Sequence, residues 1–125
     1  MAVINATSEQ IRTLLNNASI EMTCKDTEAL AEAATLVPKN TDIFIALFPN
    51  QTWDDLKVAA KAVREAGLNP VPHVPCRRIK DRAEVASIAG KLAQEAGASR
   101  ILLIAGDMPR AGRCVRFHHR RARDR

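Results

Sequence analysis

IFIALF, residues 43–48, is an uninterrupted apolar run with turn residues on both sides. A run that is apolar at every position is typical of a parallel strand covered on both faces. Just after it, Thr52 and Asp55 have the three-residue spacing of a capping box, which predicts a helix from there to Ala66. Gly67 ends that helix, because glycine readily adopts the left-handed conformation found after helix C-termini. The run therefore predicts one strand–helix unit of an α/β protein.

The same alternation of strands and helices extends along the chain in both directions. EAG at 65–67 recurs at 95–97, each time just before a predicted strand, and this spacing matches the usual size of a βα unit. The other predicted helices are Thr7–Asn17, Thr27–Leu36 with Asp26 as its cap, and a helix from the Asp81 cap to Ala96. The other predicted strands are Ala18–Thr23, Val71–Val74 and Arg100–Ala105. The third strand, 71–74, is expected to be short or irregular, because the prolines around it do not suit a central strand.

Four strands that alternate with helices, after a first helix, predict an α/β fold with a parallel sheet. Two architectures have this alternation: a small doubly wound sheet, and the N-terminal half of a (β/α)8 TIM barrel, which needs about 250 residues when complete. Neither G-x-G-x-x-G nor G-x-x-x-x-G-K-[ST] follows a predicted strand, which disfavours a nucleotide-binding doubly wound sheet. In both architectures, ligands bind at the carboxyl ends of the strands.

The formal net charge of +5 is unevenly distributed along the 125 residues. Residues 109–125 hold seven arginines and one aspartate, whereas residues 1–108 hold 12 basic and 13 acidic side chains. A basic domain surface is thereby excluded as the main clue to function. No apolar run approaches the ~20 residues that span a bilayer, so a membrane partner is not expected. Three cysteines without CxxC spacing disfavour a disulfide framework or zinc site and favour a cytoplasmic protein.

The composition divides the chain into an α/β part, residues 1–109, and an Arg-rich tail, residues 110–125, with no helical or strand period. One interpretation of the tail is an electrostatic contact with nucleic acid, attached to a small α/β binding module. The other is that the tail is disordered or translated out of frame, since Arg-rich, Leu-poor sequence is typical of a GC-rich gene in a shifted frame. The abrupt change in composition favours the second interpretation and disfavours nucleic acid as the partner.

Polar side chains at the predicted strand ends are the candidate site residues. Glu21 lies within the first strand; a carboxylate that points into a barrel mouth is desolvated, which favours its protonated form and a general-acid role. The alternative is a structural ion pair with a residue such as Arg77. Asp107 follows Gly106 after the fourth strand, where it either faces a ligand or caps a helix. His73 is the only histidine outside the tail, and a lone histidine is more often structural than catalytic.

Three stretches at these strand ends resemble one family in order and approximate spacing. They are Ser19-Ile20-Glu21, His73-Val74-Pro75-Cys76 and Ile104-Ala105-Gly106-Asp107-Met108-Pro109. The methylenetetrahydrofolate reductase family has approximately the motifs S-F-E-F-F-P-P, P-H-L-T-C and A-L-R-G-D-x-P at the corresponding strand ends. Each motif alone is weakly specific, and the three in order cover residues 18–109 of this chain.

The resemblance implies a (β/α)8 barrel that binds FAD and uses NAD(P)H to reduce methylenetetrahydrofolate to methyltetrahydrofolate. Carried over, Glu21 matches the general acid that helps to open the bridging ring of the folate, and His73 matches a residue lining the flavin site. Asp107 matches a carboxylate beside flavin and pterin, preceded here by Ala105 and Gly106. With half of the barrel strands, this chain alone is expected to show little or no turnover. It is also expected to have low stability or to self-associate through its two open sheet edges.

Overall fold

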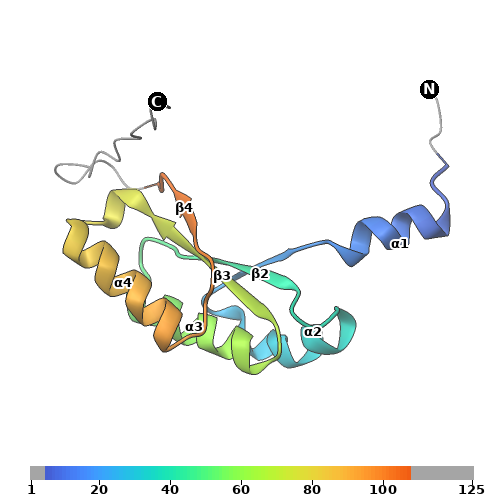
Figure 1. Ribbon diagram of the computed structural model, residues 1–125, viewed down its shortest axis with the longest axis horizontal. Helices are drawn as coiled ribbons and strands as arrows, with labels where there is room; N and C mark the ends of the chain where they lie inside the picture. Colours follow the sequence, from blue (N-terminus) through green and yellow to red (C-terminus); the bar gives the residue numbers. More distant parts are fainter. Residues whose placement is uncertain (1–4, 108–125) are drawn as a thin grey trace, which may run out of the picture.

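The computed structural model describes residues 5–107, in which four strands alternate with four α-helices (Figure 1). The helices are α1 (Ser8–Asn16), α2 (Leu30–Leu36), α3 (Trp53–Glu65) and α4 (Arg82–Gln94). The strands are β1 (Ile20–Thr23), β2 (Asp42–Ala46), β3 (Asn69–Pro75) and β4 (Leu102–Ile104). Two short 3₁₀ helices are η1 (Asp26–Ala29) and η2 (Cys76–Arg78). The predicted α/β class is confirmed.

The strands form one parallel sheet in the order β1-β2-β3-β4, so each strand pairs with its neighbours in the sequence. This order contains no reversal, whereas a doubly wound sheet needs one to send helices to both faces. Right-handed crossovers that advance in one direction place their helices on one side of the sheet. Accordingly, α2, α3 and α4 lie together below the strands in Figure 1.

The register divides the strand residues between a covered and an uncovered face, because successive side chains of a strand point in opposite directions. The face toward the helices, called the helical face below, carries Ile20, Met22, Ile43, Ile45, Val74 and Leu103. The opposite face, called the open face, carries Glu21, Phe44, Val71, His73, Leu102 and Ile104.

The hydrophobic core lies between the helical face and the helices. Ile43 and Ile45 of β2 are buried in one cluster with Leu56 and Val63 of α3 and Leu92 of α4. The apolar run 43–48 therefore lies at the centre of the core. Only its alternate residues are fully buried, because no helix of residues 5–107 covers the open face.

The capping signals that the sequence offers for α3 are confirmed. At the start of α3, Thr52 Oγ1 accepts a hydrogen bond from the Asp55 amide at 3.1 Å, and Asp55 Oδ2 accepts one from the Thr52 amide at 2.7 Å. This hydrogen bond from the Thr52 amide lowers the pKa of the Asp55 carboxyl. Thr7 caps α1 in the same reciprocal way with Gln10. Gly67 follows α3 with φ +81°, the left-handed conformation expected of a glycine at that position.

The predicted cap of the second helix is wrong. Asp26 does not cap a helix ahead of it; its Oδ2 accepts hydrogen bonds from the Thr23 amide at 2.7 Å and the Thr23 hydroxyl at 2.8 Å. The amide hydrogen bond lowers the pKa of the Asp26 carboxyl. The carboxylate thus closes the turn after β1, and the chain passes through η1 before α2 begins at Leu30.

The expectation of a short third strand is also wrong, since β3 runs over seven residues between β2 and β4. The amide of Asn69 donates to Thr41 O on the β2 side at 3.0 Å. Alternation along the strand then directs the nitrogens of Pro70 and Pro72 toward the β4 side. Pairing with β4 begins only at His73, so both prolines lie where no hydrogen bond to β4 is needed.

Helix α1 forms where predicted but buries none of its side chains. Its apolar residues Ile11, Leu14 and Leu15 share one side of the helix and are exposed, Leu14 by 76%. Figure 1 shows why: α1 extends away from the sheet at the end of a nearly straight connection to β1. Packing against the core therefore does not stabilise α1.

A polar cluster joins the amino ends of the strands. Asn69 is buried, and its Oδ1 accepts from Arg64 Nη2 at 2.8 Å while its Nδ2 donates to Asp42 Oδ1 at 2.6 Å. Arg100, just before β4, donates to the same Asp42 oxygen at 2.6 Å. The hydrogen bond from Asn69, with that from Arg100, lowers the pKa of Asp42. The cluster connects the starts of β2, β3 and β4.

We expect Asn69→Ala to lower the free energy of unfolding by about 2 kcal/mol at neutral pH, because Arg64 and Asp42 each lose a hydrogen bond to the buried amide. A carboxyl with a lowered pKa stabilises the fold above its unfolded-state pKa, and this contribution is lost as pH falls through the folded-state pKa. Removing Asn69 raises the pKa of Asp42 toward its ordinary value, so the variant should lose less stability on acidification than wild type. Urea unfolding at neutral and acidic pH measures both effects. Asn50→Ala, an exposed turn amide, is the control, and equal losses in the two variants would contradict the assignment.

Within residues 5–107, no helix is both long and apolar enough to cross a membrane. The predicted boundary at residue 109 and the tail 110–125 lie outside the described residues. The two expected sheet edges are confirmed as β1 and β4.

Candidate functional site

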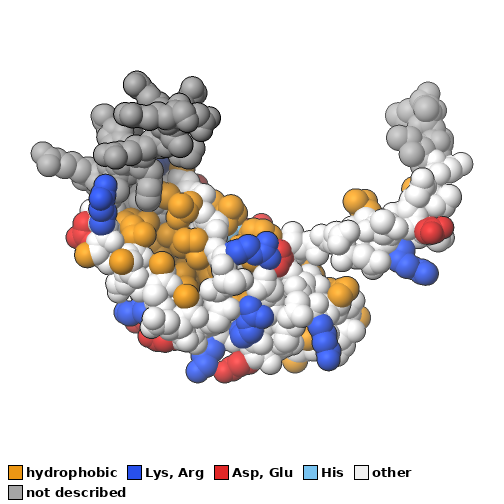
Figure 2. All heavy atoms as spheres, in the orientation of Figure 1, with side chains coloured by type: hydrophobic (Ala, Val, Ile, Leu, Met, Phe, Trp, Pro, Cys, Tyr) orange, Lys and Arg blue, Asp and Glu red, His pale blue; other side chains and the backbone are white. Residues whose placement is uncertain are grey.

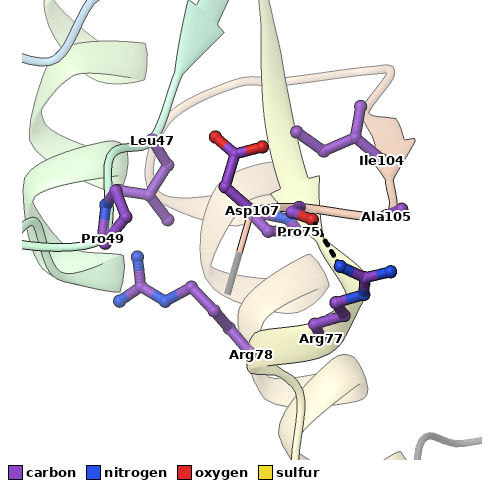
Figure 3. A pocket seen from close by; sticks show the side chains of 9 residues that line it. Leu47, Pro49, Pro75, Arg77, Arg78, Ile104, Ala105 and Asp107 are labelled. Carbon is purple, nitrogen blue, oxygen red and sulfur yellow. Dashed lines mark hydrogen bonds between the residues drawn. The ribbon is translucent and has the colours of Figure 1, made fainter. Parts of the chain in front are cut away.

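A pocket of about 290 Å³ lies at the carboxyl ends of β3 and β4, where the fold predicts a ligand site (Figure 3). Its lining combines an apolar side with two arginines and one carboxylate. The lining residues are Leu47, Pro49, Pro75, Arg77, Arg78, Ile104, Ala105, Gly106 and Asp107. In Figure 3 the Asp107 carboxylate lies between Leu47 and Ile104, and the Arg78 guanidinium points toward Pro49.

Arg78 connects the two loops that form one side of the pocket. Its Nη2 donates to Gln51 O at 2.7 Å and its Nη1 to Phe48 O at 3.2 Å. Its guanidinium carbon also lies 5.0 Å from the centre of the Trp53 ring, a cation–π contact. Arg78, which follows β3, therefore holds the turn after β2 in place.

Arg77 joins β3 to the segment after β4. Its backbone amide donates to Ala105 O at 3.3 Å, and its Nη1 donates to Gly106 O at 3.2 Å, the dashed line in Figure 3. Gly106 has φ +88°, and a Cβ atom there would lie 2.9 Å from Pro75 Cβ. Only glycine combines this backbone conformation with this close approach to β3. The turn that presents Asp107 is thus specified by its sequence.

The structure brings together three of the predicted site residues, Ala105, Gly106 and Asp107, and places Glu21 elsewhere. Glu21 is on β1, at the far edge of the sheet from β4, and it is exposed on the open face. Glu21 is exposed in the part of the chain that the structure describes, so the desolvation expected for it is not found there. The alternative role for Glu21, a structural ion pair, is not found either, since no residue in 5–107 forms an ion pair with Glu21.

His73 lies on the open face of β3 and does not line the pocket. Its ring is tilted against that of Phe44, with 5.9 Å between the ring centres. Phe44 in turn is the register partner of Glu21 on β1. Glu21, Phe44 and His73 therefore share one face, with the phenylalanine between the other two side chains.

Two structural roles at the site were not predicted from the sequence. Gln51 is buried: its Oε1 accepts from the Phe48 amide at 2.9 Å, and its Nε2 has no hydrogen-bond partner among the described residues. Trp53 lies under Arg78, and this contact depends on the β2 and β3 loops meeting in space, which no local pattern signals. The hydrogen bond of Gln51 is local, within the turn after β2.

Cys24 offers no nucleophile to the site. Cys24 Sγ donates to Ala46 O at 3.5 Å, and burial, with a smaller contribution from the Asp55 carboxylate, raises its pKa to about 11. The thiol therefore remains protonated at neutral pH. Within residues 5–107, no group of three or more His, Cys, Asp or Glu side chains is placed to hold a metal ion.

A second, larger hollow of about 550 Å³ lies between α1 and the connection from α2 to β2. Its lining is mostly apolar and includes Ile11, Leu15 and Leu36. It offers no carboxylate, so the smaller pocket at the strand ends is the better candidate for chemistry.

A scan of the chain against models of known protein families finds no family model that matches it.

Proposed function

We propose that residues 18–107 hold the first four strands of a (β/α)8 barrel of the methylenetetrahydrofolate reductase type, with the three helices between them. The observation that carries the proposal is the pocket at the carboxyl ends of β3 and β4, which contains Asp107 on its glycine turn. The unreversed strand order and the helices on a single face support a barrel rather than a doubly wound sheet. Such an enzyme reduces methylenetetrahydrofolate to methyltetrahydrofolate with NAD(P)H.

The pocket fits one wall of a flavin site. Its volume of about 290 Å³ is at the lower limit of pockets that enclose a small ligand. Leu47, Pro75 and Ile104 offer an apolar surface for a flat ring. A bound FAD would supply the hydride-carrying chemistry that no side chain provides.

Each candidate side chain would then have its own role in the reaction. The Asp107 carboxylate would accept hydrogen bonds from N–H groups of a pterin or flavin ring at the pocket. Glu21 would donate the proton that helps to open the folate's bridging ring, and it requires a cover over the open face to exclude water. His73 would line the flavin from β3. Glu21 and Asp107 are on opposite edge strands, so the folate would have to extend across the strand ends between them.

We expect the purified protein to bind FAD and methyltetrahydrofolate weakly and to show no measurable reductase turnover. Asp107→Asn should weaken methyltetrahydrofolate binding about tenfold, because hydrogen bonds to a charged acceptor contribute about 1.5–3 kcal/mol. Flavin fluorescence and calorimetric titration measure the two affinities.

The control for this experiment is Asp54→Asn, which makes the same change at an exposed carboxylate on α3, away from the pocket. It should bind both ligands as wild type does. If wild type binds neither ligand, or if both variants bind equally, the proposal is wrong.

A further inference from the structure

The apolar residues of the helical face are buried in the middle of the sheet, whereas each edge strand has one of them exposed, although Met22 of β1 is buried. Ile43 of β2 and Val74 of β3 are each 2% exposed. Ile20 of β1 is 39% exposed and Leu103 of β4 is 48% exposed, although both belong to the same face. Figure 2 shows hydrophobic side chains gathered over β4 and the neighbouring part of α4. The core therefore stays uncovered at both edges of the sheet.

The outer sides of β1 and β4 have no partner strand among the described residues. Within the described residues, β1 pairs only with β2, and β4 pairs only with β3. An edge strand leaves a row of N–H and C=O groups ready to pair with another strand, and apolar side chains beside them strengthen that tendency. Neither edge has a proline within its strand, and neither strand carries a lysine or arginine to block an approach.

A second copy of this chain offers a partner strand for each of these two edges. We infer that two copies associate, with β4 of each copy pairing in parallel with β1 of the other, to close an eight-stranded barrel around a two-fold axis. Because all four strands run in one direction, this single axis satisfies both edges at once and leaves none open.

Closure of the pair would also cover the open face. The open face becomes the barrel interior, so Phe44 and Leu102 lose their exposure to water and Glu21 gains the cover it lacks. The strand ends of both copies then form one common mouth.

This inference depends on the sheet alone and not on flavin or folate. A monomer that binds flavin would contradict the barrel pair and leave the proposed function standing. A dimer that binds no flavin would do the reverse.

Sedimentation velocity of the full chain over a range of concentrations tests the inference. We expect wild type to be a dimer with no larger species. Leu103→Lys and Ile20→Glu each place a charge at the β4–β1 contact, and each should weaken the dimer about tenfold or more. Val58→Lys, the same kind of change at an exposed site on α3, should leave the dimer unchanged. Mixing the two edge variants should restore dimers, because the new charges are opposite and meet across one contact.

A monomer of wild type at every soluble concentration would overturn the inference, whether or not an edge variant folds. An open-ended series of larger species would overturn it too, because closure limits the assembly to two copies. Equal weakening by Val58→Lys, or no recovery on mixing edge variants that retain wild-type circular dichroism, would count equally against it.

Discussion

Leu56→Ala is expected to lower the free energy of unfolding by about 3 kcal/mol, the largest effect of any single substitution proposed here. Leu56 is fully buried on α3, in the cluster that joins this helix to β2. The cavity left by its truncation would not be filled from the same helix, because the neighbouring buried positions Ala59 and Ala60 are already alanines. A loss of this size is a large fraction of the ~5–15 kcal/mol that keeps a domain folded.

Equilibrium unfolding in urea, followed by circular dichroism, measures this loss. Val58→Ala is the matched control, since Val58 is on the same helix and 61% exposed. It should change the free energy of unfolding by no more than about 0.5 kcal/mol. Similar losses in the two variants would show that α3 does not pack on the sheet as described.

Gly106→Ala is expected to cost about 2–3 kcal/mol and to abolish ligand binding at the pocket. The positive φ alone costs an alanine about 1 kcal/mol. The added Cβ would also lie 2.9 Å from Pro75 Cβ, and relief of that contact must move the segment after β4 away from β3. Such a movement shifts Asp107 and breaks the hydrogen bond from Arg77 to Gly106 O.

Gly67→Ala separates the cost of the positive φ from the cost of the close Cβ contact. Gly67 has φ +81°, but a Cβ atom there would meet nothing within 4 Å. This control should lose only the conformational contribution of about 1 kcal/mol and should bind flavin as wild type does. Unfolding in urea and flavin titration of both variants give the comparison, and an unaltered affinity in Gly106→Ala would remove the glycine turn from the site.

The sequence predicted the elements whose signals are local. The capping box at Thr52 and the glycine at Gly67 depend on residues within one turn of each other, and both were confirmed. Asp26 was misassigned because a carboxylate three residues from a threonine can bond backward as well as forward along the chain. The length of β3 depends on where β4 begins to pair, and no pattern within 69–75 contains that information.

At the candidate site, too, features set by local sequence were predictable and features set by distant contacts were not. The glycine–aspartate turn after β4 lies at the end of the sheet that the parallel topology specifies, so Asp107 was found from sequence alone. Whether Glu21 is buried depends on what lies over the open face, which its neighbours in sequence do not determine. The contribution of Arg78 arises from its contacts with the β2 loop, about 30 residues earlier in the chain.

The strand order also has a consequence for how this chain folds as it is synthesised. Each strand pairs with the one made just before it, so no segment must wait for a distant part of the sequence to emerge. Each pairing still closes a loop that contains a helix, because a parallel strand cannot follow its partner through a tight turn, and pairing of this kind forms more slowly than a hairpin. β4, the shortest of the described strands at three residues, adds to a sheet already built from the first three. The sheet therefore grows in one direction: the growing edge at β1, β2 and β3 is exposed only until the next strand emerges, whereas the outer edge of β1 stays open.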